Sequence, residues 1–202
     1  MQNKTGTLEP EAFYHIYNRA NGNENIFFKD ENYLFFLKKY KEYISPICNT
    51  YCYCLMPNHF HFLIEIKNEE ELKSYFKNKD LTGFQNLSGL VSKEFSNFFN
   101  AYSKSINKQE GRKGSLFMRP FKRKKIEEKS YLFKLVHYIH FNPKEAGLVK
   151  KIEEWKYSSY HSLLSNSPTL LERETVINWF NDSDNFRYLH LQEPEEIKYS
   201  FD

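Results

Sequence analysis

The chain has 202 residues, which is enough for one domain with a hydrophobic core of its own. Its formal net charge is only +3, so the total charge does not by itself indicate a polyanionic partner. The three clustered cysteines, Cys48, Cys52 and Cys54, exclude an ordinary disulfide framework. The first residues are polar, and no apolar run approaches membrane-spanning length. We therefore expect a cytoplasmic protein without a membrane partner.

Charge is distributed unevenly along the chain. Residues 172–202 carry eight acidic and three basic side chains, a balance of −5, which leaves +8 for the rest. A basic body with an acidic end is weakly typical of proteins that bind nucleic acids. We predict one functional domain over residues 1–165, followed by an acidic C-terminal extension over 166–202 whose role the sequence does not define.

In the first part of the chain, the pattern predicts three strands and one helix. Residues 12–19 alternate and carry β-forming rings, which predicts a strand. Helical periodicity follows over 30–43, with Asp30 as the expected N-cap. Residues 47–55 and 59–66 read as two strands joined by a short turn. Residues 69–81 are expected to form a charged loop or a short helix.

In the second part of the chain, the pattern predicts a long helix over 85–106, a basic loop over 108–114 and a basic strand over 116–126. A last helix is expected over 130–142, capped by Ser130 and ended by Pro143. The order through the basic strand is that of a β-α-β-β-α-β unit. The predicted class is α+β: a ferredoxin-like or RRM-like antiparallel sheet with two helices on one face, plus a C-terminal helix. We expect the other face to stay free to carry chemistry.

Two histidines on one strand form the first candidate site. His59 and His61 are two residues apart, so their side chains should share a sheet face, whereas Phe60 and Phe62 should point into the core. Such a pair can hold one metal ion, although a simple pair on a sheet face would produce the same pattern. Further ligands must come from elsewhere in the chain.

Tyr138 and Asn142 form the second candidate site. They are four residues apart on the last predicted helix and should share a face. An asparagine oxygen suits Mg²⁺ or Mn²⁺, and a tyrosine can act as a covalent nucleophile. Alternatively, Tyr138 is a core or interface ring and Asn142 is an ordinary residue at the end of the helix. His15, His137 and His140 are near in pattern, but the sequence assigns none of them as a base.

A basic segment interleaved with aromatic rings forms the third signal. Lysine and arginine contact phosphates, and rings such as Phe117 and Phe121 can stack on bases, although a solvated basic face would look the same. The candidate DNA-binding residues are Arg112, Lys113, Arg119, Lys122, Arg123, Lys124 and Lys125.

Four pieces occur together in a distinctive order: GSLFMR at 114–119 within the basic segment, MPNHFHFLI at 56–64, YIHFNPKEAGLV at 138–149 and WKYSSY at 155–160. In combination they resemble the single-tyrosine HUH transposases, and most closely the REP-associated tyrosine transposase branch. The resemblance covers residues 12–162, nearly all of the predicted domain. It implies that His59 and His61 are the paired metal ligands, that Tyr138 is the nucleophile and that Asn142 is the third ligand, where the insertion-sequence branch usually has glutamine.

The resemblance implies a transposase-like single-strand DNA endonuclease and strand transferase. Tyr138 would form a 5′-phosphotyrosine with the help of Mg²⁺ or Mn²⁺, and no ATP would be needed. The implied partner is single-stranded DNA beside a hairpin. A homodimer with an exchanged tyrosine helix and a monomer that uses its own Tyr138 both remain open.

Three other interpretations compete with this one. Cys52, Cys54, His59 and His61 could bind zinc, although structural zinc pairs usually have wider spacing than C-x-C. A non-catalytic RRM-like module could bind nucleic acid through its sheet, although no clear RNP ring pattern is present. A degenerate transposase could bind without cutting, although the four candidate site residues are all in place.

Overall fold

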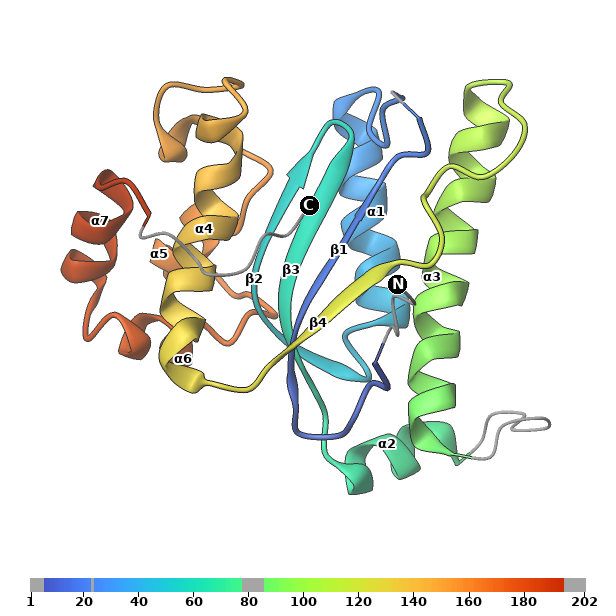
Figure 1. Ribbon diagram of the computed structural model, residues 1–202, viewed down its shortest axis with the longest axis horizontal. Helices are drawn as coiled ribbons and strands as arrows, with labels where there is room; N and C mark the ends of the chain where they lie inside the picture. Colours follow the sequence, from blue (N-terminus) through green and yellow to red (C-terminus); the bar gives the residue numbers. More distant parts are fainter. Residues whose placement is uncertain (1–5, 23, 78–85, 195–202) are drawn as a thin grey trace.

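The computed structural model describes residues 6–22, 24–77 and 86–194. Its centre is a four-stranded antiparallel sheet in the order β2-β3-β1-β4, which is the order of a ferredoxin-like unit (Figure 1). The strands are β1 (Phe13–Arg19), β2 (Cys48–Met56), β3 (His59–Ile66) and β4 (Lys122–Ile126). The expected α+β class with a ferredoxin-like antiparallel sheet is therefore confirmed.

One face of the sheet packs against two long helices, α1 (Asp30–Tyr43) and α3 (Leu87–Gln109). Their apolar stripes meet the inward residues of β3. For example, the Phe36 ring of α1 lies 5.2 Å from the Phe60 ring and 4.7 Å from the Phe98 ring of α3, measured between centroids. The short helix α2 (Glu69–Phe76) adds Leu72 and Phe76 to this core. Burial of these rings outweighs the cost of ordering the two helices.

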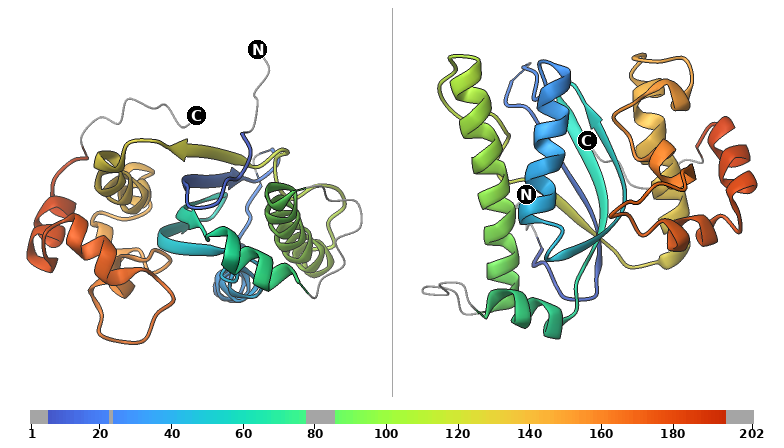
Figure 2. Two further views of the ribbon diagram at one scale, coloured as in Figure 1. Left: turned by 90° about the horizontal axis from the view of Figure 1, so that it is seen from below. Right: turned by 180° about the vertical axis from the view of Figure 1, so that it is seen from behind.

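The second face is covered by α4 (Leu132–Glu145), so the expectation that it stays free is wrong. Figure 2 shows α4 on the side of the sheet opposite α1 and α3. Leu135, Val136 and Ile139 of α4 pack against Leu63 of β3 in a second core. This contact could not be predicted from the strands alone, because it depends on where the last helix docks.

Smaller elements pack outside α4. They are the 3₁₀ turns η1 (Lys129–Tyr131) and η2 (Ile152–Glu154), and the helices α5 (Tyr160–Leu164), α6 (Arg173–Trp179) and α7 (Ser183–Leu191). Val176, Phe180 and Phe186 belong to the same apolar core as α4. A division of the chain at residue 165 stays a prediction. None of the helices within the described ranges is long and apolar enough to cross a membrane.

Two elements differ from the sequence expectation at their ends. The strand expected over 116–126 pairs regularly only from Lys122, because Pro120 has no amide hydrogen to donate to a ladder; Phe117 makes a single bridge to Ala20. The last helix does not stop at Asn142 but continues through Pro143 to Glu145. Backbone bonds from Ala146 to Asn142 and from Leu148 to Pro143 carry the turn past the proline, which is itself buried.

The helix caps also differ from expectation. Lys29, and not Asp30, is the N-cap of α1, and the Asn32 side chain accepts the amide hydrogens of Phe28 and Lys29. Ser130 lies in η1 and does not cap α4. The short-helix alternative for 69–81 is correct as far as Phe76, and α3 extends into the expected basic loop. Residues 78–81 of the range predicted over 69–81, and residue 85 of the helix predicted over 85–106, lie outside the described residues.

Candidate metal and nucleophile site

Strand β3 presents its two histidines to the face that α4 covers. The register pairs His61 with Tyr17 of β1 and with Cys54 of β2, which places it well inside the sheet. Its side chain is buried, at 5 % exposure, whereas His59 is half-buried at the strand end. The two rings lie 5.1 Å apart in an edge-on arrangement. The predicted shared face is confirmed, but it is not an exposed one.

Each histidine of the pair has a specific polar neighbour. His59 Nδ1 lies 2.7 Å from Asn58 Oδ1, and His61 Nδ1 lies 2.9 Å from His15 Nε2. His15 comes from the middle of β1 and is fully buried. Sequence reasoning left His15 unassigned, although its alternation with Ile16 already placed it on the same face as Tyr17, the residue that pairs with His61.

Burial keeps the imidazoles of His15 and His61 neutral. It lowers the pKa of His15 to about 3, with a smaller contribution from the positive charge of Lys124. Burial also lowers the pKa of His61 well below its usual value, helped by the neighbouring His15 and His59. A neutral imidazole is the form that binds metals. Within the described part of the chain, His61 Nε2 is buried without a hydrogen-bond partner, which is the state expected of a nitrogen reserved for a ligand.

Helix α4 brings Tyr138 to the same place. The Tyr138 ring stands edge-on to His61 at 6.0 Å and to His15 at 6.4 Å, measured between centroids. Asn142 follows one turn later and is 6 % exposed. Its Nδ2 donates to the carbonyl of Tyr138 at 2.7 Å, so that bond uses the amide nitrogen and not Oδ1, the atom a hard cation would take.

The cysteines do not extend this site into a zinc centre. Among the residues that the structure describes, no three His, Cys, Asp or Glu side chains form a group that could hold a metal ion. Burial also raises the pKa of the Cys52 and Cys54 thiols, Cys54 well above its usual value, which opposes the thiolate that zinc requires. The predicted metal site of His59, His61 and Asn142 contains only two such side chains and one amide oxygen. The absence of a three-residue group therefore does not exclude it.

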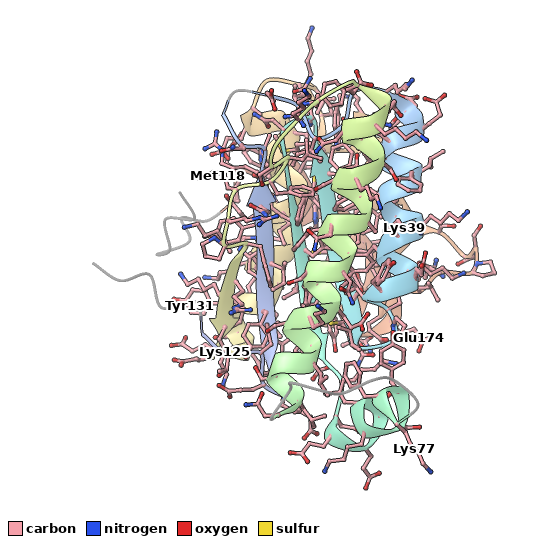
Figure 3. All side chains as sticks on the ribbon, turned by 90° about the vertical axis from the view of Figure 1, so that its right-hand side faces the viewer. Lys39, Lys77, Met118, Lys125, Tyr131 and Glu174 are labelled. Atoms are coloured by element: carbon pink, nitrogen blue, oxygen red, sulfur yellow. The ribbon has the colours of Figure 1, made fainter. Side chains whose placement is uncertain are left out.

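The predicted DNA-binding residues do not form one uniform surface. On β4, Lys122 and Lys124 pair with Tyr17 and His15 and therefore belong to the histidine face, whereas Arg123 and Lys125 belong to the α3 face. Lys125 forms an ion pair with Glu9. Figure 3 shows Met118 and Lys125 along the sheet edge beside α3.

The remaining predicted basic residues lie before β4. Arg112 is paired with Glu24 and also bonds Asn107, whereas Lys113 and Arg119 are exposed. Arg119 lines a hollow of about 530 Å³ between α3 and the segment before β4. Arg123 lines it too, with its guanidinium carbon 5.0 Å from the centroid of the Phe121 ring. The hollow thus combines cationic groups with aromatic surface, on the far side of the sheet from the histidines.

The fold and the site together define a class of protein, in which a ferredoxin-like sheet carries paired histidines that face a tyrosine on a following helix. A solved structure described as a REP-associated tyrosine transposase bound to a REP hairpin has this fold, with a TM-score of 0.56 over 83 % of this chain and 88 % of that one, at 16 % identity.

Sequence comparison gives the same family name. A protein of Haemophilus influenzae named "Putative REP-associated tyrosine transposase" is 22 % identical over 139 residues, which are 62 % of this chain and 69 % of that protein. No protein-family model matches the chain. The resemblance to REP-associated tyrosine transposases that the sequence motifs predicted is therefore confirmed in both sequence and fold.

Proposed function

We propose that this chain is a transposase-like single-strand DNA endonuclease and strand transferase that cuts with Tyr138. The observation that carries the proposal is the contact between the Tyr138 ring and His61, whose Nε2 is buried without a partner in the described structure. His59, His61 and Asn142 are the residues that would hold Mg²⁺ or Mn²⁺. When bound there, a divalent cation would supply Lewis-acid polarisation of the scissile phosphate.

The chemistry of the chain's own residues follows from this arrangement. The Tyr138 hydroxyl oxygen attacks the phosphorus, the bond to the 3′ oxygen breaks, and the released strand ends in a 3′-hydroxyl. The other strand end stays attached as a 5′-phosphotyrosine. Because the new ester replaces the broken one, attack by another 3′-hydroxyl rejoins DNA and frees the tyrosine. His61 stays neutral because burial lowers its pKa, and the histidines orient the reacting groups.

Single-stranded DNA beside a hairpin is the proposed substrate. The structural relative is described as bound to a REP hairpin, and the basic residues of β4 occupy the edge of the sheet that leads to the histidine face. Lys122 and Lys124 would contact phosphates near the reaction, whereas Arg123 and Phe121 would meet DNA on the other side of the edge strand.

The contact of Tyr138 with His15 and His61 is made within one chain. This supports a tyrosine that acts in its own subunit. A homodimer remains a prediction, since two subunits that each use their own Tyr138 could still associate. The RRM-like alternative requires an open sheet face for base stacking, whereas in the described structure α4 covers the face opposite α1 and α3.

A covalent-capture experiment tests the proposal. Single-stranded DNA that carries a REP-type hairpin and a 3′-end label is incubated with the protein and Mn²⁺, then separated under denaturing conditions. We expect a labelled protein band with wild type and none with Tyr138→Phe, which still binds the strand. Tyr131→Phe, at the residue just before α4, is the control and should keep the adduct. An adduct that survives in Tyr138→Phe would assign the nucleophile to another residue.

A further inference from the structure

The WKYSSY segment at 155–160 lies along the outer edge of β2 and pairs with it like a short additional strand. The Leu55 amide donates to the Tyr157 carbonyl at 2.9 Å, and the Ser159 amide donates to the Tyr53 carbonyl at 2.9 Å. The Ser159 hydroxyl oxygen also accepts the Tyr53 amide hydrogen at 2.9 Å. Ser159 is therefore held to the sheet through both backbone groups of one β2 residue.

The Ser159 hydroxyl also contacts the helix that carries the tyrosine. It lies 2.7 Å from His140 Nε2, and His140 Nδ1 lies 2.9 Å from His190 Nε2. His190 Nδ1 lies 2.8 Å from the Phe186 carbonyl oxygen, which can only accept, so the neutral His190 carries its proton on Nδ1. His140 must then donate from Nδ1 and accept at Nε2. The Ser159 hydroxyl is therefore the donor to His140.

His140 and Tyr138 lie on opposite flanks of the α4 face that packs on the sheet. Two residues correspond to a rotation of about 200° around a helix. Ile139, between them, belongs to the apolar core shared with β2 and β3. On one flank the Tyr138 ring faces His61, and on the other His140 meets Ser159. Because apolar contacts are not directional, the hydrogen bond on the second flank is what fixes the rotation of α4.

We propose that Ser159 is a positioning residue, whose hydrogen bond to His140 sets the rotation of α4 that turns Tyr138 toward His61. The anchor is close to its target, because Cys54, the β2 residue that pairs with His61, directly follows the residue that holds Ser159. The inference rests on the proposed function only for the reaction that Tyr138 carries out. The packing of Tyr138 on His61 can be measured in the metal-free protein.

The first test reads the position of Tyr138 without DNA or metal. NMR of the metal-free protein should show cross-relaxation between the ring protons of Tyr138 and His61, and Ser159→Ala should weaken this signal. Ser158→Ala is the matched control and should keep it, since Ser158 is buried in the same segment and its hydroxyl donates to the Trp155 carbonyl at 3.3 Å. No signal in wild type, an unchanged signal in Ser159→Ala or an equal loss in Ser158→Ala would each overturn the proposal.

The second test separates the rate of reaction from binding. At saturating strand and Mn²⁺, Ser159→Ala should form the covalent adduct about 10–100-fold more slowly, the size expected when a reacting group is displaced by up to about 1 Å. The half-saturating concentration of the strand should stay near that of wild type, because the proposed phosphate contacts of Lys122 and Lys124 lie on β4. Ser158→Ala should keep the wild-type rate. An unchanged rate in Ser159→Ala would overturn the proposal.

Two variants of His140 keep the test valid if Ser159→Ala does not fold. His140→Phe and His140→Gln both remove Nδ1, the donor to His190, but only glutamine offers an oxygen that can accept the Ser159 hydroxyl hydrogen. The ring signal and the adduct rate should fall in His140→Phe and recover in His140→Gln, and equal values in the two would overturn the proposal. If wild type forms no adduct, the proposed function fails, and the ring signal between Tyr138 and His61 still decides this inference.

Discussion

At the residue scale, His59 offers the cleanest test of the proposed metal site. The sequence predicted that the sheet face that carries chemistry stays free. His61 is instead buried against His15 and Tyr138, so its loss would leave a cavity and remove the hydrogen-bond partner of His15 Nε2. The half-buried His59 tests metal binding with less effect on stability.

We predict that His59→Ala loses at least about 100-fold in Mn²⁺-dependent cleavage, since it removes one of three proposed ligands. Its unfolding midpoint should stay close to that of wild type. His161→Ala removes an exposed histidine on α5 whose Nε2 lies 2.6 Å from the Glu153 carbonyl oxygen, outside the proposed site, and serves as the control. Cleavage should also stop in chelator and return with Mn²⁺ or Mg²⁺. Full cleavage by chelated protein would disprove the metal site.

The sequence predicted part of this site because strand and helix periodicity are local. Alternation on β3 placed His59 and His61 together, and one helical turn placed Tyr138 before Asn142. His15 was missed because its part depends on the pairing of β1 with β3, which no single element encodes. The ligand roles themselves remain predictions.

At the element scale, β4 divides its charges between the two faces of the sheet. The sequence treated Arg123 and Lys124 as equivalent phosphate contacts, but alternation sends Lys124 toward His15 and Arg123 toward Ser92 of α3, whose hydroxyl lies 3.3 Å from its guanidinium. Burial lowers the pKa of both side chains. Substitutions at the two positions should therefore have different consequences.

We predict that Lys124→Gln weakens binding of single-stranded DNA and reduces cleavage, because its positive charge lies on the reaction face. The slope of log affinity against log salt concentration should fall by about 0.7, the value for one phosphate contact on a single strand. Lys125→Gln is the matched control on the same strand, since Lys125 lies on the other face and pairs with Glu9. A salt slope that changes equally in both variants would contradict this division of β4.

The sequence predicted well those elements whose limits follow from their own residue pattern. The limits of α1 and β3 agree with expectation because an amphipathic stripe and an alternating run each define one buried face. The limits of α4 and β4 differ from expectation, because they depend on contacts with other segments of the chain. Backbone hydrogen bonds from Ala146 to Asn142 and from Leu148 to Pro143 continue α4 past the proline, and β4 pairs regularly with β1 only after Pro120.

At the scale of the whole molecule, the C-terminal helices seal the side of α4 that faces away from the sheet. His190 of α7 packs at 4.0 Å from the Phe186 ring and contacts His140 of α4. The residues from Arg173 to Leu191 thus complete the second core, even though the sequence marked them mainly by acidic charge. Their burial of two histidines makes stability depend on pH.

We predict that acid weakens the fold through this pair. Burial lowers the pKa of His190 to about 3 and that of His140 well below its usual value. In the unfolded chain both titrate near 6.5, so below that pH the unfolded state binds more protons and is favoured. The stabilising effect is complete above about pH 6.5 and is lost as the pH falls toward 3. Each such histidine contributes a slope of about 1.4 kcal/mol per pH unit.

His190→Gln isolates one of these protons. Urea unfolding between pH 7 and pH 5 should show the free energy of unfolding falling less steeply in the variant than in wild type, by about one proton's share of the slope. His15 and His61 are present in both proteins, so their own contribution cancels in the difference. If His190→Gln keeps the wild-type slope, His190 must already be protonated in the folded protein, and the packing of α7 on α4 would need another polar explanation.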